Sequence, residues 1–455
     1  MATQTVRCER HGESTRLSCV DCGQPLCPKC SVRTEVGLKC EACAKPAVET
    51  PSTFPRRRRL PLALGLVGLA IVGIAVALFL DSPQAGVEPV TAEPQGTWSP
   101  AAEPSSIRGT TVALPTGDGV LVAGGGVGAI PLTAGEIYDP QDEAWTATGE
   151  LAQARRGHQG VVLDDGRVLV AGGFAEGEVL ATVEIYDPGT RTWSMAEPMA
   201  SPRLGHTLTV LDDGHVLATG GTGPEGAGGA GGGQTLRPQD SAEVYDPLAD
   251  AWQSAGSMGA ARFEHTATEL GDGRVLIAGG MGGGGEELVA LSSAELYDPA
   301  TDTFLGTNAM ADGRANHAAV ALSDGRVLVV GGGGGERGDS SLATVEIFRT
   351  RQGSWEQASA MRGARRGATA TRLDDGRVLV VGGELVQGGT RRSLDTAEVF
   401  DPAADEWAPA GSMSCPRSEH AAVLLDGGDV LVVAGDAAFP GEAPAAQSCV
   451  DRYQP

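Results

Sequence analysis

The first 43 residues hold seven of the nine cysteines of this 455-residue chain, together with one histidine. These side chains form four pairs with two residues between their members, and the pairs are Cys8 with His11, Cys19 with Cys22, Cys27 with Cys30, and Cys40 with Cys43. This spacing lets both members of a pair bind one ion at Zn–S distances of about 2.3 Å. Eight ligands are enough for two closed tetrahedral sites. The segment 1–45 is too short to build a core, so we expect two structural Zn²⁺ ions to supply most of its folding free energy.

The same residues resemble a B-box-type zinc finger, in the short version found at the N-terminus of some bacterial membrane proteins. The resemblance covers residues 8–43 and implies interleaved sites, with Cys8, His11, Cys27 and Cys30 on one ion and Cys19, Cys22, Cys40 and Cys43 on the other. B-boxes commonly have histidines where this chain has its last two cysteines. Spacing alone leaves sequential pairing open. A redox role for a C-x-x-C pair would need a thioredoxin-like strand and helix, which the sequence does not provide.

A long apolar segment follows the cysteines. Residues 60–80, LPLALGLVGLAIVGIAVALFL, contain no charged side chain and as a helix would extend about 30 Å, so they predict one transmembrane helix in contact with membrane lipid. The segment lies too far from the N-terminus for a cleaved signal peptide. Arg56–Arg59 directly precede it, and basic residues are retained on the cytoplasmic side. We therefore expect a single-pass protein of the bacterial inner membrane, with its N-terminus cytoplasmic and the region after residue 80 periplasmic.

Charge is distributed unequally about this segment. Residues 1–59 carry 11 basic and 6 acidic side chains, whereas the rest of the chain carries 23 basic and 52 acidic ones. An acidic surface repels phosphate, so we expect no nucleic-acid partner. Residues 46–59 are predicted to form a basic juxtamembrane segment, and residues 81–96, rich in proline and acid, a tether.

Residues 97–455 repeat with a period of about 50. One unit has the sequence RRGHQGVVLDDGRVLVAGG, a variable loop, VEIYDPGTRTW and SMAEPMASPR. Apolar runs flanking an Asp-Gly turn predict a hairpin, the alternating VEIYDP segment predicts a third strand, and the Trp segment predicts a fourth. Such a period with short strands predicts propeller blades. The glycine pairs begin at Gly124, Gly172, Gly220, Gly279, Gly331 and Gly382, and we expect close backbone approach or positive φ there.

The recurring Gly-Gly, Tyr and Trp positions resemble the Kelch repeat, and the resemblance implies an all-β, seven-bladed Kelch-type β-propeller over residues 97–455. The departures are Phe304 for Trp, Ala368 for His and Arg349 for Asp. The last unit lacks its Trp strand, which Thr97–Trp98 match, so we expect residues 97–100 to complete that unit and close the ring. Cys415 and Cys449 both belong to this unit and are predicted to lie within reach of a disulfide bond.

Kelch-like propellers include oxidases whose copper is held by Tyr and His, so the resemblance raises the question whether Tyr and His of the repeats could hold copper here. All five tyrosines occupy one repeated position, and five of the six propeller histidines, His158, His206, His265, His317 and His420, occupy another. A residue present at the same place in most units indicates a structural role. We therefore expect the propeller to contain no catalytic residue and no bound cofactor, and we expect that the protein is not an enzyme. The glycine tracts lack the Gly-Lys-Ser/Thr and helix of a P-loop.

The expected function is therefore binding. Loops between the second and third strands vary greatly in length, and the longest runs from Gly220 to Ser241, whereas the opposite turns are nearly all Asp-Gly. Recognition is normally placed on the variable loops of a repeated scaffold. We expect these loops to bind an unknown protein or glycan. The alternatives are an envelope scaffold without a specific ligand and a Kelch-type oxidoreductase.

Overall fold

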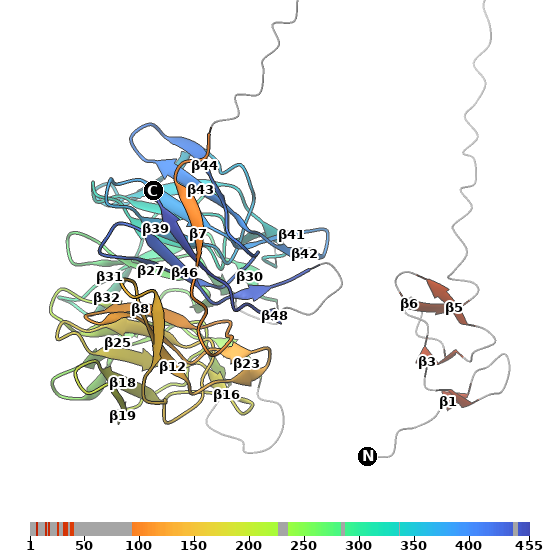
Figure 1. Ribbon diagram of the computed structural model, residues 1–455, viewed down its shortest axis with the longest axis horizontal. Helices are drawn as coiled ribbons and strands as arrows, with labels where there is room; N and C mark the ends of the chain where they lie inside the picture. Colours follow the sequence, from red (N-terminus) through yellow and green to blue (C-terminus); the bar gives the residue numbers. More distant parts are fainter. Residues whose placement is uncertain are drawn as a thin grey trace, which may run out of the picture. The chain divides into compact units, whose positions relative to one another are not determined.

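A computed structural model describes residues 93–225, 235–283, 287–335, 337–439 and 445–455, together with six short strands within residues 6–40 (Figure 1). The chain divides into two units, Met1–Glu88 and Pro89–Pro455. In the first unit, three hairpins pair β1 (Val6–Arg7) with β2 (Ser14–Thr15), β3 (Leu17–Ser18) with β4 (Pro25–Leu26), and β5 (Ser31–Thr34) with β6 (Gly37–Cys40).

The predicted zinc ligands are not described, except that the backbone of Cys40 ends β6. The predicted span at 60–80 also lies outside the described residues. Within the described ranges, no helix is long and apolar enough to cross a membrane.

The described residues of the second unit form seven four-stranded antiparallel sheets. From the innermost strand outward, the first three are β8 (Val112–Thr116), β9 (Gly119–Ala123), β12 (Gly135–Asp139), β13 (Ala144–Ala147); β14 (Gln159–Val162), β15 (Val168–Ala171), β18 (Val183–Asp187), β19 (Thr192–Ala196); and β20 (Thr207–Val210), β21 (Val216–Thr219), β24 (Ser241–Asp246), β25 (Ala251–Ser257). The next two are β27 (Thr266–Glu269), β28 (Val275–Ala278), β31 (Ala294–Asp298), β32 (Thr303–Gly306); and β33 (Ala318–Ala321), β34 (Val327–Val330), β37 (Val345–Arg349), β38 (Ser354–Ala358). The last two are β39 (Thr369–Arg372), β40 (Val378–Val381), β43 (Thr396–Asp401), β44 (Glu406–Ser412); and β45 (Ala421–Leu424), β46 (Val430–Val433), β49 (Val450–Gln454), β7 (Thr97–Ala101).

The sequence of each unit explains its sheet. The second strand is a short apolar run such as VLVA and is buried on both faces, because neighbouring sheets cover it on each side. The described core is divided into seven apolar clusters, each between two adjacent sheets. An aromatic residue of the third strand packs on one of the fourth, as Tyr186 does on Trp193 at 5.1 Å between ring centroids. Phe304 takes the same place beside Tyr297, which explains why the departure from Trp is tolerated.

The ring closes through the strand nearest the beginning of this unit. Each innermost strand contacts the innermost strands of two neighbouring sheets, and β45 contacts β8. Strand β7 pairs with β49, and Trp98 lies opposite Tyr453 with 5.1 Å between their ring centroids. A disulfide bond joins Cys415 and Cys449, whose Cα atoms are 6.6 Å apart. Both the predicted closure and the predicted disulfide are thus confirmed.

The glycine pairs have the predicted positive φ. Gly172 and Gly173 have φ of 65° and 96°. A Cβ atom on Gly172 would lie 2.6 Å from the carbonyl oxygen of Arg203, so the close approach excludes any larger residue without a shift of the backbone.

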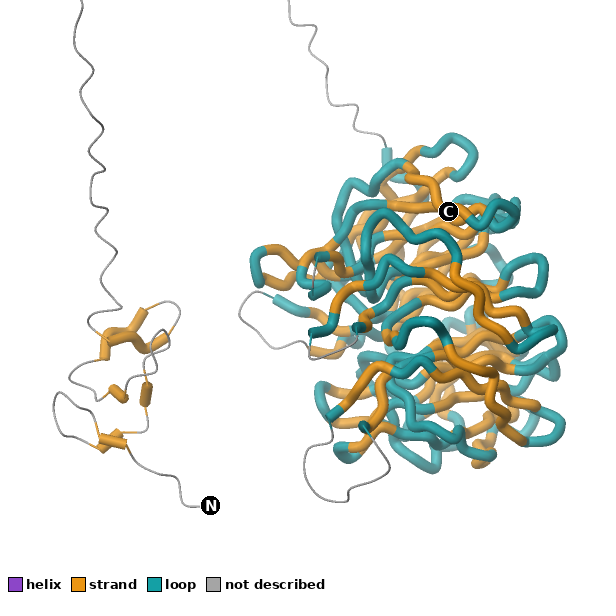
Figure 2. The backbone as a smooth tube through the Cα atoms, turned by 180° about the vertical axis from the view of Figure 1, so that it is seen from behind, coloured by secondary structure: helices purple, strands orange, loops and turns teal. Residues whose placement is uncertain are grey.

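Most loops between the second and third strands form small sheets of their own. These are β10 (Gly126–Val127) with β11 (Ile130–Pro131), β16 (Phe174–Ala175) with β17 (Glu178–Val179), β22 (Thr222–Pro224) with β23 (Leu236–Pro238), β29 (Met281–Gly282) with β26 (Arg262–Phe263) and β30 (Val289–Ala290), β35 (Gly333–Gly334) with β36 (Ser340–Ser341), β41 (Glu384–Gln387) with β42 (Thr390–Ser393), and β47 (Asp436–Ala437) with β48 (Ala445–Ala446). The labelled ones lie on one side of the propeller in Figure 1. We call this side the loop face, and Figure 2 shows its loops and strands from behind.

Candidate functional site

Seven buried ion pairs hold the loop face to the sheets. In each four-stranded sheet, the arginine before the first strand forms an ion pair with a carboxylate on the third strand, with N···O distances of 2.5–2.8 Å. The pairs are Arg108–Glu136, Arg155–Glu184, Arg203–Glu243, Arg262–Glu295, Arg314–Glu346, Arg365–Glu398 and Arg417–Asp451. Each guanidinium also donates to carbonyl oxygens near the glycine pair, as Arg155 does to those of Gly172 and Thr182. The ion pairs therefore hold the segment that leads into the first strand against the second and third strands of the same sheet.

The five repeated histidines lie next to these arginines and are buried. Nε2 of His317 and of His420 lies 2.9 Å from a threonine hydroxyl of the preceding sheet, on Thr266 and Thr369 respectively. Burial lowers the pKa of His317 to about 3, so the imidazole is neutral at physiological pH. His265, His317 and His420 therefore join neighbouring sheets, which is a structural role of the kind predicted for the repeated histidines.

A ring of seven left-handed residues surrounds the propeller axis at the loop face. We call them the mouth ring, and they are Thr110, Gly157, Gly205, Glu264, Asn316, Gly367 and Glu419, with φ of 47–68°. Each lies two residues after one of the buried arginines. Five backbone hydrogen bonds of 2.8–3.1 Å connect ring residues of consecutive sheets. All seven residues line a cavity of about 620 Å³ that extends along the innermost strands.

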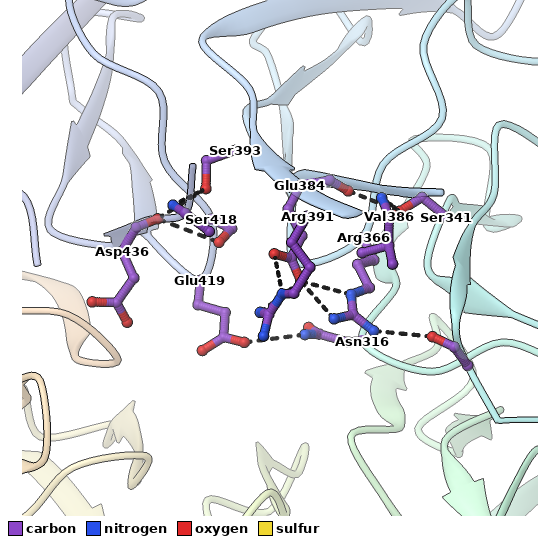
Figure 3. Close-up of polar contacts among 12 residues, drawn as sticks. Asn316, Ser341, Arg366, Glu384, Val386, Arg391, Ser393, Ser418, Glu419 and Asp436 are labelled. Carbon is purple, nitrogen blue, oxygen red and sulfur yellow. Dashed lines mark hydrogen bonds and ion pairs between the residues drawn. The ribbon is translucent and has the colours of Figure 1, made fainter. Parts of the chain in front are cut away.

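Four members of the mouth ring, Thr110, Glu264, Asn316 and Glu419, bring hydrogen-bonding side chains into a position where the other sheets have glycine. A left-handed conformation costs an L-residue about 1–2 kcal/mol, and glycine avoids this cost. Glu264 and Glu419 have exposed side chains, and Asn316 donates from Nδ2 to Oε1 of Glu419 at 3.4 Å (Figure 3). The surrounding protein desolvates both carboxyl groups and raises their pKa values, and for Glu419 the nearby Glu264 adds to this effect.

The two arginines nearest this part of the ring are already paired. Figure 3 shows Arg366 and Arg391 converging on Glu384 of β41. Arg366 approaches Oε1 of Glu384 at 2.6 Å and Arg391 approaches the same atom at 2.9 Å. Arg366 also donates to the carbonyl oxygen of Gly338 at 2.9 Å. These contacts tie the sixth sheet's loop to the fifth and leave the mouth carboxylates without an ion pair among the described residues.

Exposed apolar side chains gather on the loops of the same face. Of the ten exposed large apolar residues in the described ranges, six lie between second and third strands: Val127, Ile130, Leu236, Leu288, Val289 and Phe439. Ile130 is 67% exposed and Phe439 is 45% exposed. These side chains belong to the loops of four sheets, so the loop face presents more exposed apolar side chains than the rest of the described surface, as contact faces commonly do.

The residues considered for oxidase chemistry do not converge. The tyrosines are separated on five sheets, each packed on an aromatic neighbour. His215, the one propeller histidine outside the repeated position, lies in an Asp-Gly turn, with Nδ1 3.0 Å from Asp213. In the part of the chain that the structure describes, no group of three or more His, Cys, Asp or Glu residues is arranged to hold a metal ion.

Sequence reasoning missed both the seven carboxylates of the buried ion pairs and the mouth ring. The carboxylates could have been found, because Glu recurs two residues before the aromatic position in six units. For the mouth ring, the only signal in the sequence was that glycine stands two residues after the ion-paired arginine in three of the seven repeats.

The comparisons agree with this architecture. Residues 155–200, 314–362 and 365–414 match the Kelch motif, and residues 3–35 match the B-box zinc finger. The chain therefore contains Kelch repeats and a B-box zinc finger, and the all-β second unit is a Kelch β-propeller.

Relatives and solved structures extend the similarity. Human Kelch-like protein 34 is 31% identical over 36% of this chain, and mouse Kelch-like protein 23 is 27% identical over 41%. The chain spans only 24% and 31% of the length of these relatives. A fungal alcohol oxidase of the AA5 family, in complex with copper, has the same fold with a TM-score of 0.62 and 18% identity over 79% of this chain and 76% of its own. YjhT has a TM-score of 0.51 and 15% identity over 68% of this chain and 99% of its own.

Proposed function

We propose that this chain is a membrane-anchored binding protein whose seven-bladed propeller, with one blade for each four-stranded sheet, recognises a protein through the loop face. The observation that carries the proposal is the gathering of exposed apolar side chains on that face. Its hairpins present Val127, Ile130 and Phe439 to solvent, whereas the opposite face consists of the short Asp-Gly turns between first and second strands and the turns between third and fourth strands. A rigid scaffold with variable, partly apolar loops on one face is suited to bind a partner surface.

A binding role fits this chain better than oxidase chemistry. The similarity to the alcohol oxidase is a similarity of fold, and the tyrosines and histidines here are used in packing between strands and sheets. The relatives that share the repeats are Kelch-like proteins. We therefore assign no catalytic residue.

The N-terminal module and the segment 60–80 complete the proposal. The donor set of seven cysteines and His11 fits Zn²⁺, which binds thiolate and imidazole tetrahedrally. The four arginines before an uncharged 21-residue segment support a single membrane span with the zinc module in the cytoplasm and the propeller outside it. In this arrangement the propeller binds its partner on one side of the membrane and the zinc module lies on the other.

Site-specific photo-crosslinking of the full-length chain tests the proposal. A photoreactive residue at Ile130 lies on the loop face, and one at Leu248, which is 96% exposed, lies in a turn on the opposite face. We expect discrete protein adducts from Ile130 and none from Leu248. Equal adducts from both positions, or adducts from Leu248 alone, would contradict binding at the loop face.

A further inference from the structure

The mouth ring differs from sheet to sheet in a way that folding does not require. Gly157, Gly205 and Gly367 show that glycine is sufficient at this position, and glycine adopts φ near 60° without strain. The fourth and seventh sheets nevertheless have Glu264 and Glu419, with φ of 52° and 53°. The chain thus keeps two carboxylates where the backbone favours glycine, at the entrance to a cavity.

These carboxylates are free to meet a ligand. Neither takes part in an ion pair among the described residues, and the only side-chain donor to them is Asn316. The neighbouring cations, Arg366 and Arg391, are held by Glu384. Asp436 adds a third carboxylate near Glu419, and its own carboxyl group lies in no ion pair among the described residues.

The cavity wall contains a second unsatisfied group. His206 lines the same cavity and is 1% exposed, and neither of its ring nitrogens has a hydrogen-bond partner among the described residues. His317 and His420 in other sheets bond a threonine, but the position that corresponds to this threonine in the sheet before His206 holds Gln159. A buried polar group without a partner indicates that water or a polar ligand group lies beside it.

We propose that the mouth ring binds a lysine or arginine side chain of the protein partner, with its cationic group between Glu264 and Glu419 and its flanking residues on the apolar loops. This inference rests on the proposed function and names the chemistry of the partner at that site. The charge of the chain supports it, because the residues after position 59 carry 52 acidic and 23 basic side chains and would attract a basic partner. Within the described ranges, too few ligands converge here to hold a metal ion.

The test uses selection from a random peptide library on the full-length protein in detergent, with three variants in parallel. The variants Glu264→Gly and Glu419→Gly install the residue that other sheets use, so we expect their melting temperatures to be unchanged or raised. Glu143→Gly is the matched control, because Glu143 also has positive φ but lies in a turn on the opposite face. The selected peptides are then synthesised with Gln in place of each basic residue, and their Kd values are measured.

We expect the wild type and Glu143→Gly to enrich the same peptides, each with a basic residue among apolar ones. Loss of either mouth carboxylate, or of the peptide's basic residue, should raise Kd about tenfold, because a hydrogen bond to a charged group is lost. Enriched peptides without a basic residue, or peptides bound equally by the glycine variants, would overturn this inference and leave the proposed function standing. Failure of the wild type to enrich any peptide would count against both.

Discussion

Removing one member of a buried ion pair should destabilise the propeller far more than removing one member of an exposed pair in the same sheet. Glu184 and Arg155 have fully buried side chains 2.8 Å apart. Glu184 also accepts from the backbone N–H of Ala152 at 2.6 Å and of Gln153 at 3.1 Å. Glu184→Gln keeps the shape of the side chain, but it leaves the guanidinium without a counterion and turns an amide N–H₂ toward other donors.

The magnitude follows from burial. Breaking a buried pair by removing one partner costs about 3–5 kcal/mol, because an uncompensated charge stays in the interior. The control, Asp165→Asn, alters the pair Arg167–Asp165 at 2.7 Å, whose side chains are 33% and 50% exposed. An exposed pair contributes at most about 1 kcal/mol.

Urea unfolding of the full-length chain, followed by tryptophan fluorescence, measures both variants. All six tryptophans lie between residues 98 and 407, so the signal reports on the propeller. We expect the free energy of unfolding to fall by about 3–5 kcal/mol for Glu184→Gln and by less than about 1 kcal/mol for Asp165→Asn. Equal losses for the two variants would refute the assignment of the buried pairs as the contacts that fix each sheet.

Four further predictions concern pH, ring closure, the disulfide and zinc. The folded-state pKa of His317, about 3, lies below the unfolded value near 6.5, so unfolded chains bind more protons and stability falls as pH decreases through this range. Replacing His317 with Ala, as at Ala368, should reduce the loss between pH 6.5 and pH 5 by up to about 2 kcal/mol in urea titrations, and an unchanged loss would argue against a neutral buried imidazole. Trp98→Ala should lower the free energy of unfolding by about 3 kcal/mol, and an unaltered melting temperature would reject closure by this strand. Mass spectrometry of non-reduced peptides should find Cys415 linked to Cys449, and reduction should cost about 2–4 kcal/mol, whereas two free thiols would dismiss the bond. Metal analysis of the full-length chain should give two zinc ions that a chelator removes, and a single ion would refute the two-site arrangement.

Features that recur in all or nearly all units could be predicted from the sequence, because each sheet requires them for the same local reason. The glycine pairs, the strand hairpins and the stacked aromatic positions are of this kind. Closure by Trp98 was predictable because the last unit lacks a strand that the start of the propeller supplies.

The carboxylates of the buried pairs were harder to predict. Glu184 stands between apolar residues of an alternating strand, where a charged side chain normally faces solvent. Its partner, Arg155, lies 29 residues earlier and is brought into contact only by the complete sheet. The mouth ring depends on the whole propeller in the same way, because Glu264 and Glu419 are 155 residues apart in the sequence and come to line one cavity only when the ring is formed.

Hydrogen–deuterium exchange of the full-length chain, alone and bound to the protein that it crosslinks, tests most directly whether the loop face is the binding surface. We predict slower exchange on binding in β10 and β11, in Glu384–Ser393 and at the mouth ring, with no change in the Asp-Gly turns of the opposite face. Protection of those turns with an unchanged loop face would contradict the account.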